Sequence, residues 1–125
     1  MVLAARGRRY TERYLRRLCQ CQPMLGTLST DVVEAARRLG YADSVEDRSV
    51  RQIDLRDTIR NSVYPIVGVN LRRLRGIWSP HAQVVVEITS DLIRIHDPLL
   101  GRLRLKPQTF EAAWADADYL TILVK

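Results

Sequence analysis

The first half of the chain carries apolar residues at helical spacing. Residues 11–20 and residues 31–40 each place apolar side chains three or four positions apart, with arginines on the opposite side. Thr11 is placed to cap the first helix, and Asp31 opens an acidic capping pattern for the second. Gly40 is typical of a left-handed residue that ends a helix. The pattern therefore predicts two short amphipathic helices.

The periodicity changes from helical to extended after residue 60. Residues 41–53 alternate weakly and predict a strand-like or irregular connection, and residues 54–59 predict a short helix. Pro65 then stands in front of an apolar run that is typical of a buried strand. The later predicted strands are 82–89, 92–96, 102–105 and 118–124, with a helix over 107–114 before the last. Helices followed by an antiparallel sheet predict an α+β fold.

Length and composition fit one domain and exclude a membrane span. The 125 residues are 46% hydrophobic, which is enough for one compact core. Charged residues interrupt every apolar run, so no segment approaches the roughly 18 apolar residues that a membrane helix needs. Arginines follow the opening Met1-Val-Leu-Ala-Ala immediately, which is the wrong order for a secretory signal. We therefore expect a cytoplasmic protein.

The positive charge allows two interpretations. The formal net charge is +6, and clustered guanidinium groups attract anionic partners such as nucleic acid. The arginines occur in pairs scattered along the chain, mostly where a helix turns its polar face outward. This spacing favours a solvated surface over an anion-binding one.

The cysteines do not indicate a disulfide or a metal site. Cys19 and Cys21 are two residues apart, and side chains at that spacing in a helix point in widely different directions. The chain has no second cysteine pair and only two histidines, both distant in sequence, so a zinc site is disfavoured. Cys19 lies near the C-terminal end of its helix, where the dipole disfavours a thiolate. We therefore expect no cofactor or metal, and a core thiol rather than a nucleophile.

The candidate chemistry lies in the second half of the chain. His81 stands at the start of the first long predicted strand and Asp97 at the end of the next. Antiparallel strands joined by a tight turn bring these two ends together, so we expect an imidazole beside a carboxylate. Such a carboxylate orients a histidine that acts as general base for a nucleophile. On spacing alone, a strand cap at His81 and an Asp97-Pro98 turn remain the favoured alternative.

His96 and Trp78 lie near these residues in the sequence and are weaker candidates for a functional role. His96 is expected on the strand face opposite Asp97, as a surface or sheet-face residue. Trp78 has two interpretations, as a wall of a substrate groove or as a cover over the edge of the core, and the second is favoured.

The sequence around these residues resembles that of a known family. The segments His81-Ala-Gln-Val-Val-Val-Glu, Leu92-Ile-Arg-Ile-His-Asp97-Pro98 and Phe110…Trp114 are similar to the second half of the bacteriocin-processing cysteine peptidases, which cleave double-glycine leaders and often form part of peptide exporters. The resemblance implies a papain-like fold with N-terminal helices packed on a C-terminal antiparallel sheet. It also implies that His81 and Asp97 are the catalytic base and its orienting carboxylate.

The resemblance is incomplete at the start of the chain. The family's nucleophilic cysteine heads a helix and follows a glutamine of the oxyanion hole, and this alignment sets Met1 inside that helix. Cysteine and glutamine would then lie before residue 1, roughly two helical turns upstream. We therefore expect residues 1–125 to form one papain-like domain, N-terminally truncated relative to the family, without appreciable peptidase activity.

Three functional hypotheses follow. The first is a peptidase-like domain that still binds an extended peptide, such as a leader peptide, against its sheet. The second is a small arginine-rich module that binds nucleic acid or an acidic protein; it is disfavoured because aromatic residues make up only 6% of the chain and are not interleaved with the arginines. The third is a partner or second copy that covers an exposed apolar face, giving a homo-oligomer.

Overall fold

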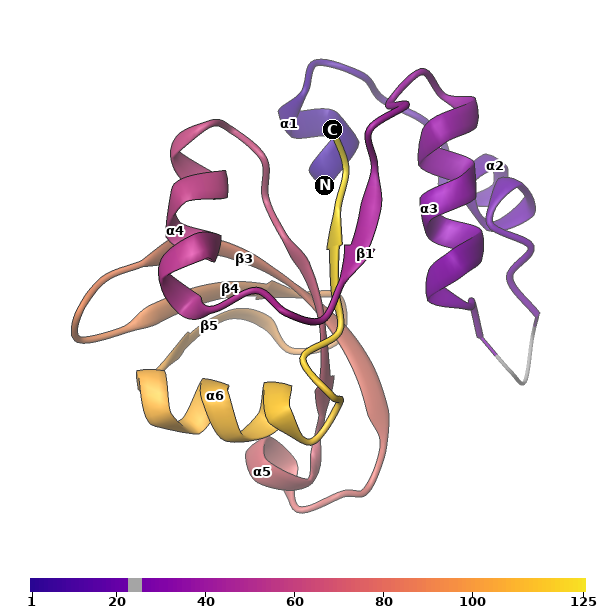
Figure 1. Ribbon diagram of the computed structural model, residues 1–125. Helices are drawn as coiled ribbons and strands as arrows, with labels where there is room; N and C mark the ends of the chain where they lie inside the picture. The colour runs from indigo at the N-terminus through magenta and orange to yellow at the C-terminus, as the bar shows by residue number, and fades with distance from the viewer. Residues whose placement is uncertain (23–25) are drawn as a thin grey trace.

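The protein is built around one antiparallel sheet with helices on both faces (Figure 1). The computed structural model describes residues 1–22 and 26–125. The sheet has six strands in the order β1-β6-β2-β3-β4-β5. The helices are α1 (Val2–Ala5), α2 (Glu12–Leu18), α3 (Ser29–Arg38), α4 (Gln52–Arg60), α5 (Arg72–Arg75) and α6 (Pro107–Ala115). The strands are β1 (Val45–Asp47), β2 (Ile66–Asn70), β3 (Pro80–Ile88), β4 (Ile93–Asp97), β5 (Gly101–Leu105) and β6 (Thr121–Leu123).

One face of the sheet holds the larger core. Alternate residues of a strand point to opposite faces, and the inward set of β2, β3 and β4 packs against α4 and α6. Phe110 and Trp114 lie one turn apart on α6, with ring centroids separated by 5.4 Å. The buried members of this core are Leu55, Val67, Val69, Val85, Ile88, Ile93, Ile95, Phe110, Ala113 and Trp114.

The other face holds a smaller core beneath the N-terminal helices. Its buried members are Val2, Val33, Ala36, Ile122 and Val124, so it joins α1 and α3 to the C-terminal strand. Ile66 and Val84, which alternate with residues of the larger core, pack against this cluster. The helices α2 and α3 stand at this side of the sheet in Figure 1. The predicted α+β arrangement of helices packed on an antiparallel sheet is confirmed, and α4 and α6 additionally cover the opposite face.

The start of α2 agrees with the predicted capping residue, and the starts of α3 and α4 differ. Thr11 accepts a hydrogen bond from the backbone N–H of Tyr14, so it caps α2 as expected. Asp31 does not cap α3, because that helix begins at Ser29 and Asp31 lies in its first turn. Asp54 does not open α4 either. The helix starts two residues earlier, and the Asp54 carboxylate accepts the backbone N–H of Arg51 at 2.8 Å.

The last strand is shorter than its apolar pattern predicts. Asp118 and Tyr119 both have positive φ, at 56°, so they form a turn after α6, and β6 spans only three residues. Tyr119 packs its ring edgewise against Trp114 at 5.1 Å, and the indole N–H of Trp114 donates to the Leu120 carbonyl. The aromatic contact and this hydrogen bond hold the turn, so its residues leave the strand.

Within the described residues, no helix has both the length and the apolar content that crossing a bilayer requires.

Gly68 allows the turn before β6 to approach β2 closely. Its backbone N–H donates to the Leu120 carbonyl at 2.9 Å. A Cβ at position 68 would lie 2.9 Å from Leu120 Cδ2 and 3.0 Å from Leu120 Cβ. These separations are shorter than normal van der Waals contact, so only glycine fits without a shift of the neighbouring chain.

We expect Gly68→Ala to destabilise the fold. Overpacking against Leu120 costs about 1–3 kcal/mol, which outweighs the ~0.4–1 kcal/mol that alanine contributes by restricting the unfolded chain. Urea unfolding of the wild type, Gly68→Ala, Leu120→Ala and the double variant measures the coupling. The double variant should be more stable than the sum of the single losses predicts, since truncating Leu120 removes the clash. Losses that add within about 0.5 kcal/mol would contradict this explanation.

Candidate functional site

The candidate site forms where β3 begins and β4 ends. The two strands pair antiparallel with Val84 opposite His96, which sets Gln83 across from Asp97 and His81 two residues further along the same face. His81 Nε2 lies 2.8 Å from Asp97 Oδ2. The two side chains are 11% and 0% exposed. The expected proximity of imidazole and carboxylate is therefore confirmed.

The Asp97 carboxylate is fully hydrogen-bonded. Oδ1 accepts the backbone N–H groups of Leu99 at 2.8 Å and Leu100 at 2.9 Å, which closes a tight turn through Pro98. Oδ2 faces His81 and also accepts an N–H of the Gln83 amide at 2.7 Å. The Asp97-Pro98 turn of the alternative interpretation is therefore also present. Oδ1 forms this turn, while Oδ2 of the same carboxylate contacts His81.

These contacts keep Asp97 ionised. Burial by itself would raise the pKa of the carboxyl group, but the hydrogen bonds from His81, Gln83, Leu100 and Leu99 outweigh burial and lower that pKa from 3.8 to about 2. An ionised carboxylate can only accept hydrogen bonds. His81 Nε2–H is therefore the donor to Asp97, and in the neutral ring Nδ1 carries the free lone pair. That tautomer suits a general base acting through Nδ1.

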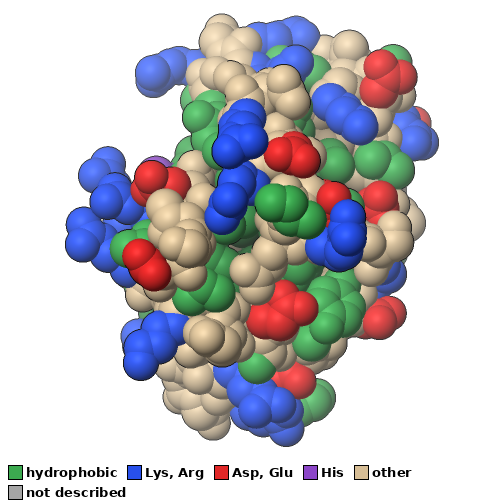
Figure 2. Space-filling model, turned by 60° about the vertical axis from the view of Figure 1, so that its left-hand side comes forward, with side chains coloured by type: hydrophobic (Ala, Val, Ile, Leu, Met, Phe, Trp, Pro, Cys, Tyr) green, Lys and Arg blue, Asp and Glu red, His purple; other side chains and the backbone are tan. Residues whose placement is uncertain are grey.

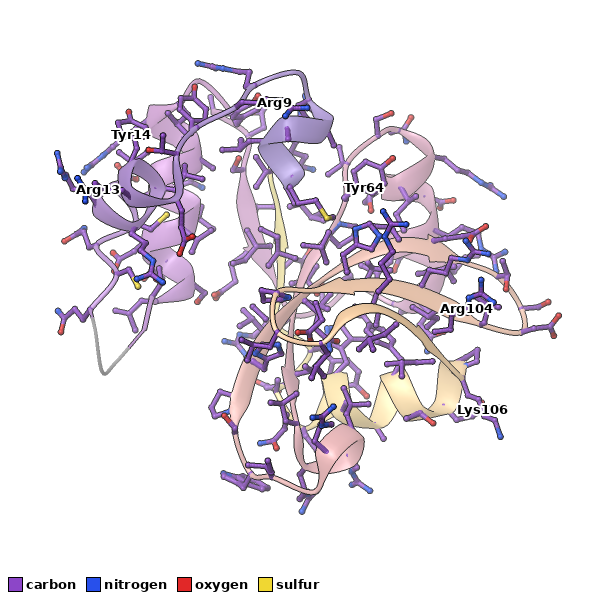
Figure 3. The ribbon with its side chains drawn as sticks, turned by 180° about the vertical axis from the view of Figure 1, so that it is seen from behind. Arg9, Arg13, Tyr14, Tyr64, Arg104 and Lys106 are labelled. Carbon is purple, nitrogen blue, oxygen red and sulfur yellow. The ribbon has the colours of Figure 1, made fainter. Side chains whose placement is uncertain are left out.

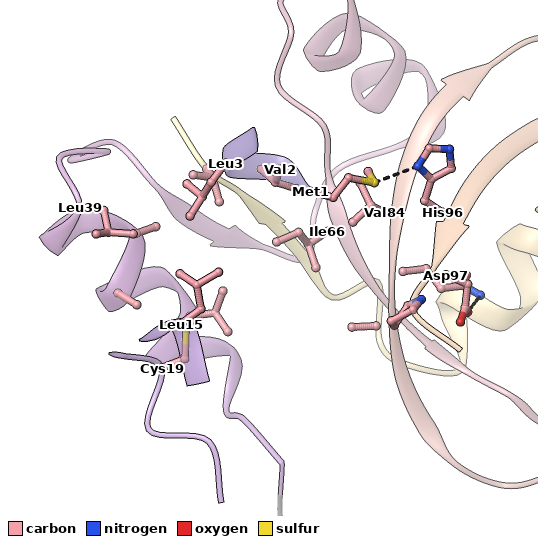
Figure 4. A pocket seen from close by; sticks show the side chains of 17 residues that line it. Met1, Val2, Leu3, Leu15, Cys19, Leu39, Ile66, Val84, His96 and Asp97 are labelled. Atoms are coloured by element: carbon pink, nitrogen blue, oxygen red, sulfur yellow. Dashed lines mark hydrogen bonds between the residues drawn. The ribbon is translucent and has the colours of Figure 1, made fainter. Parts of the chain in front are cut away.

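An apolar pocket lies between the N-terminal helices and the sheet and reaches this site. It encloses about 420 Å³. The helical wall includes Leu15, Cys19 and Leu39, and the strand wall includes Ile66 and Val84 (Figure 4). Gln83, Asp97 and Pro98 also line it. A pocket of this size can hold apolar side chains of a peptide next to the strand ends.

Cys19 lies across the pocket from Asp97, the hydrogen-bond partner of His81. Figure 4 places Cys19 on the helical side of the pocket and Asp97 on the strand side. Cys19 is partly buried at the C-terminal end of α2, and burial together with Asp31 and Cys21 raises the pKa of its thiol. A raised pKa keeps the sulfur protonated and poorly nucleophilic. Among the described residues, no thiol hydrogen-bonds to His81.

The structure confirms the predicted position of His96 and contradicts the favoured interpretation of Trp78. His96 lies on the face opposite Asp97, as predicted, and its Nδ1 is 2.9 Å from Met1 Sδ (Figure 4). Trp78 is 68% exposed, so the favoured interpretation of a cover over the core edge is wrong. The segment after β2 carries Trp78 clear of the core, and the Arg72 guanidinium stacks over its ring at 5.0 Å.

Basic residues are spread over the surface and are often paired. Arg38 contacts Glu34 and Arg94 contacts Glu87, and both Arg72 and Arg73 contact Asp116. Positive and negative side chains are interspersed on the face in Figure 2. Figure 3 shows Arg9 and Arg13 on the helical side, far from Arg104 and Lys106 near the end of β5.

Within residues 1–22 and 26–125, no cluster of three or more histidine, cysteine, aspartate or glutamate side chains could hold a metal ion.

Sequence reasoning missed Gln83. A signal was present, because Gln83 interrupts an apolar strand and shares the face of His81 two residues earlier. A polar residue on the inward face of a buried strand needs a hydrogen-bond partner, and Asp97 is that partner here.

The fold has a counterpart among solved structures. The crystal structure of the peptidase domain of Streptococcus ComA, a bi-functional ABC transporter involved in a quorum sensing pathway, superposes with a TM-score of 0.71 and 25% sequence identity. The match covers 98% of this chain and 84% of the ComA domain. No protein-family model matches the chain, and no curated protein matches it significantly in sequence. The resemblance to exporter-associated peptidase domains that the sequence indicates is confirmed.

We expect Asp97→Asn to remove an acid-sensitive part of the stability. A carboxyl pKa lowered from 3.8 to about 2 contributes roughly 2 kcal/mol of folding free energy, present above the unfolded pKa and lost as pH falls through 3.8 towards 2. Urea unfolding from neutral pH down to about pH 2 should show the wild-type advantage over Asp97→Asn shrinking across that window. Asp91→Asn, in the exposed turn after β3, controls for the loss of one negative charge. An advantage independent of pH would contradict the assignment.

Proposed function

We propose that residues 1–125 form one cysteine-peptidase-like domain related to leader-peptide processing, with His81 and Asp97 as its base and orienting carboxylate. The observation that carries the proposal is the partly buried 2.8 Å contact between His81 Nε2 and Asp97 Oδ2, on a fold shared with the ComA peptidase domain. In such a pair the carboxylate selects the tautomer and stabilises the charged ring once it accepts a proton.

The proposed ligand is an extended peptide with apolar side chains, such as a double-glycine leader. The apolar pocket supports this proposal because it runs from the helices to the strand ends that carry His81 and Asp97. Apolar side chains of the peptide would fill the space beside Ile66 and Val84, and the backbone of the peptide would pass the imidazole.

We further propose that residues 1–125 by themselves bind such a peptide without cleaving it. A cysteine peptidase needs a thiolate within hydrogen-bonding reach of its histidine. Cys19 lies on the helical side of the pocket, and the raised pKa of its thiol disfavours the thiolate.

The ion pairs argue against the arginine-rich alternative. A nucleic-acid interface needs guanidinium groups that converge on one face and are free to contact phosphates. Here arginines on separate helices and strands contact carboxylates, as Arg38 does with Glu34 and Arg94 with Glu87. Nucleic acid is therefore the less favoured partner.

The proposed lack of peptidase activity predicts the outcome of a cleavage assay. Incubation of residues 1–125 with a double-glycine leader peptide should yield no time-dependent product by mass spectrometry, because no thiol of the described residues hydrogen-bonds to His81. The same sample treated with a thiol alkylator is the control, and it should behave identically. Cleavage that the alkylator abolishes would contradict the proposal and would direct attention to Cys19 and Cys21.

The proposed peptide site predicts the outcome of a binding experiment. Titration of the leader peptide should shift the NMR signals of the His81 ring. Ala82→Trp should weaken binding at least about tenfold, roughly 1.4 kcal/mol, because Ala82 is an exposed residue that lines the pocket beside His81.

The matched control is Asp91→Trp, which adds the same bulk at the opposite end of the β3–β4 hairpin. It should bind the peptide as the wild type does. Absence of any His81 shift, or equal weakening by both substitutions, would refute peptide binding at this pocket.

A further inference from the structure

Gln83 makes a contact that strand packing alone does not require. Its side chain belongs to a residue that is 1% exposed, on the inward face of β3 between His81 and Val85. Its Nε2 donates to Asp97 Oδ2 at 2.7 Å, the same oxygen that accepts from His81. Among the described residues, Gln83 Oε1 is buried without a hydrogen-bond partner.

The orientation of this amide follows from its partner. If the group were turned by half a rotation, Oε1 would stand against the ionised Asp97 oxygen, and two acceptors would face each other. The N–H of Gln83 therefore points at Asp97.

Leaving Oε1 unpaired has an energetic cost. A buried acceptor without a partner destabilises a fold by about 1–3 kcal/mol, whereas an apolar residue at this position would avoid that cost. Neighbouring inward positions on the sheet hold Val67 and Val85, so an aliphatic side chain matches the surroundings. We therefore look for the role of the Gln83 amide in its hydrogen bond to Asp97.

Asp97 is the group that benefits. Two backbone N–H groups hold Oδ1 in the Pro98 turn, and they leave Oδ2 to be oriented by side chains alone. The Gln83 amide supplies a second fixed donor to Oδ2, directly across the strand pair. This second donor fixes the position of Oδ2, so that the oxygen can accept the N–H of His81 from one direction.

We propose that Gln83 is a positioning residue that holds the Asp97 carboxylate against His81 Nε2, so that the neutral imidazole keeps its proton on Nε2 and presents Nδ1. This role rests on the proposed function, since it gives the base a defined tautomer, but it is measurable without any peptide or catalytic turnover. Gln83 acts on the imidazole only through Asp97.

The test compares Gln83→Met with Gln52→Leu by NMR. Methionine keeps the length of the glutamine side chain and removes both amide atoms. Gln52 provides the matched control because its Nε2 also donates to a carboxylate at 2.8 Å, that of Glu111, in another part of the fold. Two signals are followed: the ¹⁵N shifts of the His81 ring at a pH where the ring is neutral, and the ¹³C shift of the Asp97 carboxyl group during acid titration.

In Gln83→Met we expect the His81 ring to populate both tautomers and the Asp97 pKa to rise from about 2 towards 3.8, because one donor to the carboxylate is lost. Gln52→Leu should change neither signal.

An unchanged His81 tautomer and an unchanged Asp97 titration in Gln83→Met would overturn the positioning role. If Gln83→Met does not fold, Gln83→Leu is measured in the same way, and unchanged signals there would overturn it equally. A failure of peptide binding with a confirmed tautomer change would count against the proposed function alone. Normal binding with unchanged signals would count against Gln83 alone.

Discussion

The Asp97 carboxylate connects the turn, the strand pair and the candidate base. One oxygen accepts two backbone N–H groups of the turn that follows β4, and the other accepts from His81 and Gln83 across the β3–β4 ladder. These four hydrogen bonds offset the unfavourable burial of a charge. Without them burial would raise the pKa of the carboxyl group, the turn would lose its cap, and the imidazole would lose the acceptor that determines its tautomer.

The two-sided sheet explains how this charge can be buried at the edge of an otherwise apolar interior. Ile93, Ile95 and Asp97 point the same way along β4, so the carboxylate continues the row of the larger core to the end of the strand. Their neighbours on the opposite face, such as Val84, contribute to the smaller core and the apolar pocket. The candidate base therefore stands at a strand end that both cores hold in place, next to a space suited to apolar side chains.

The remaining features of the chain have structural explanations. Arginines, which dominate the positive charge, often contact carboxylates on their own or a neighbouring element, and Trp78 stacks against Arg72 in an exposed segment. Cys19 lies against the pocket as a protonated thiol. The hydrogen-bonded group of His81, Gln83 and Asp97 is therefore the candidate functional site of the described residues.

The sequence by itself determined the class of the fold and the meeting of His81 with Asp97. Both depend on local regularities: helical and alternating periodicity, proline and glycine at element ends, and the geometry of an antiparallel hairpin. Strand order, the helices on both faces and the turn at Asp118 and Tyr119 depend on contacts between distant segments, such as Trp114 with Leu120. The role of Gln83 became clear only in the structure, because the cross-strand register sets its amide opposite Asp97, whereas the sequence signal was only a polar residue at an inward strand position.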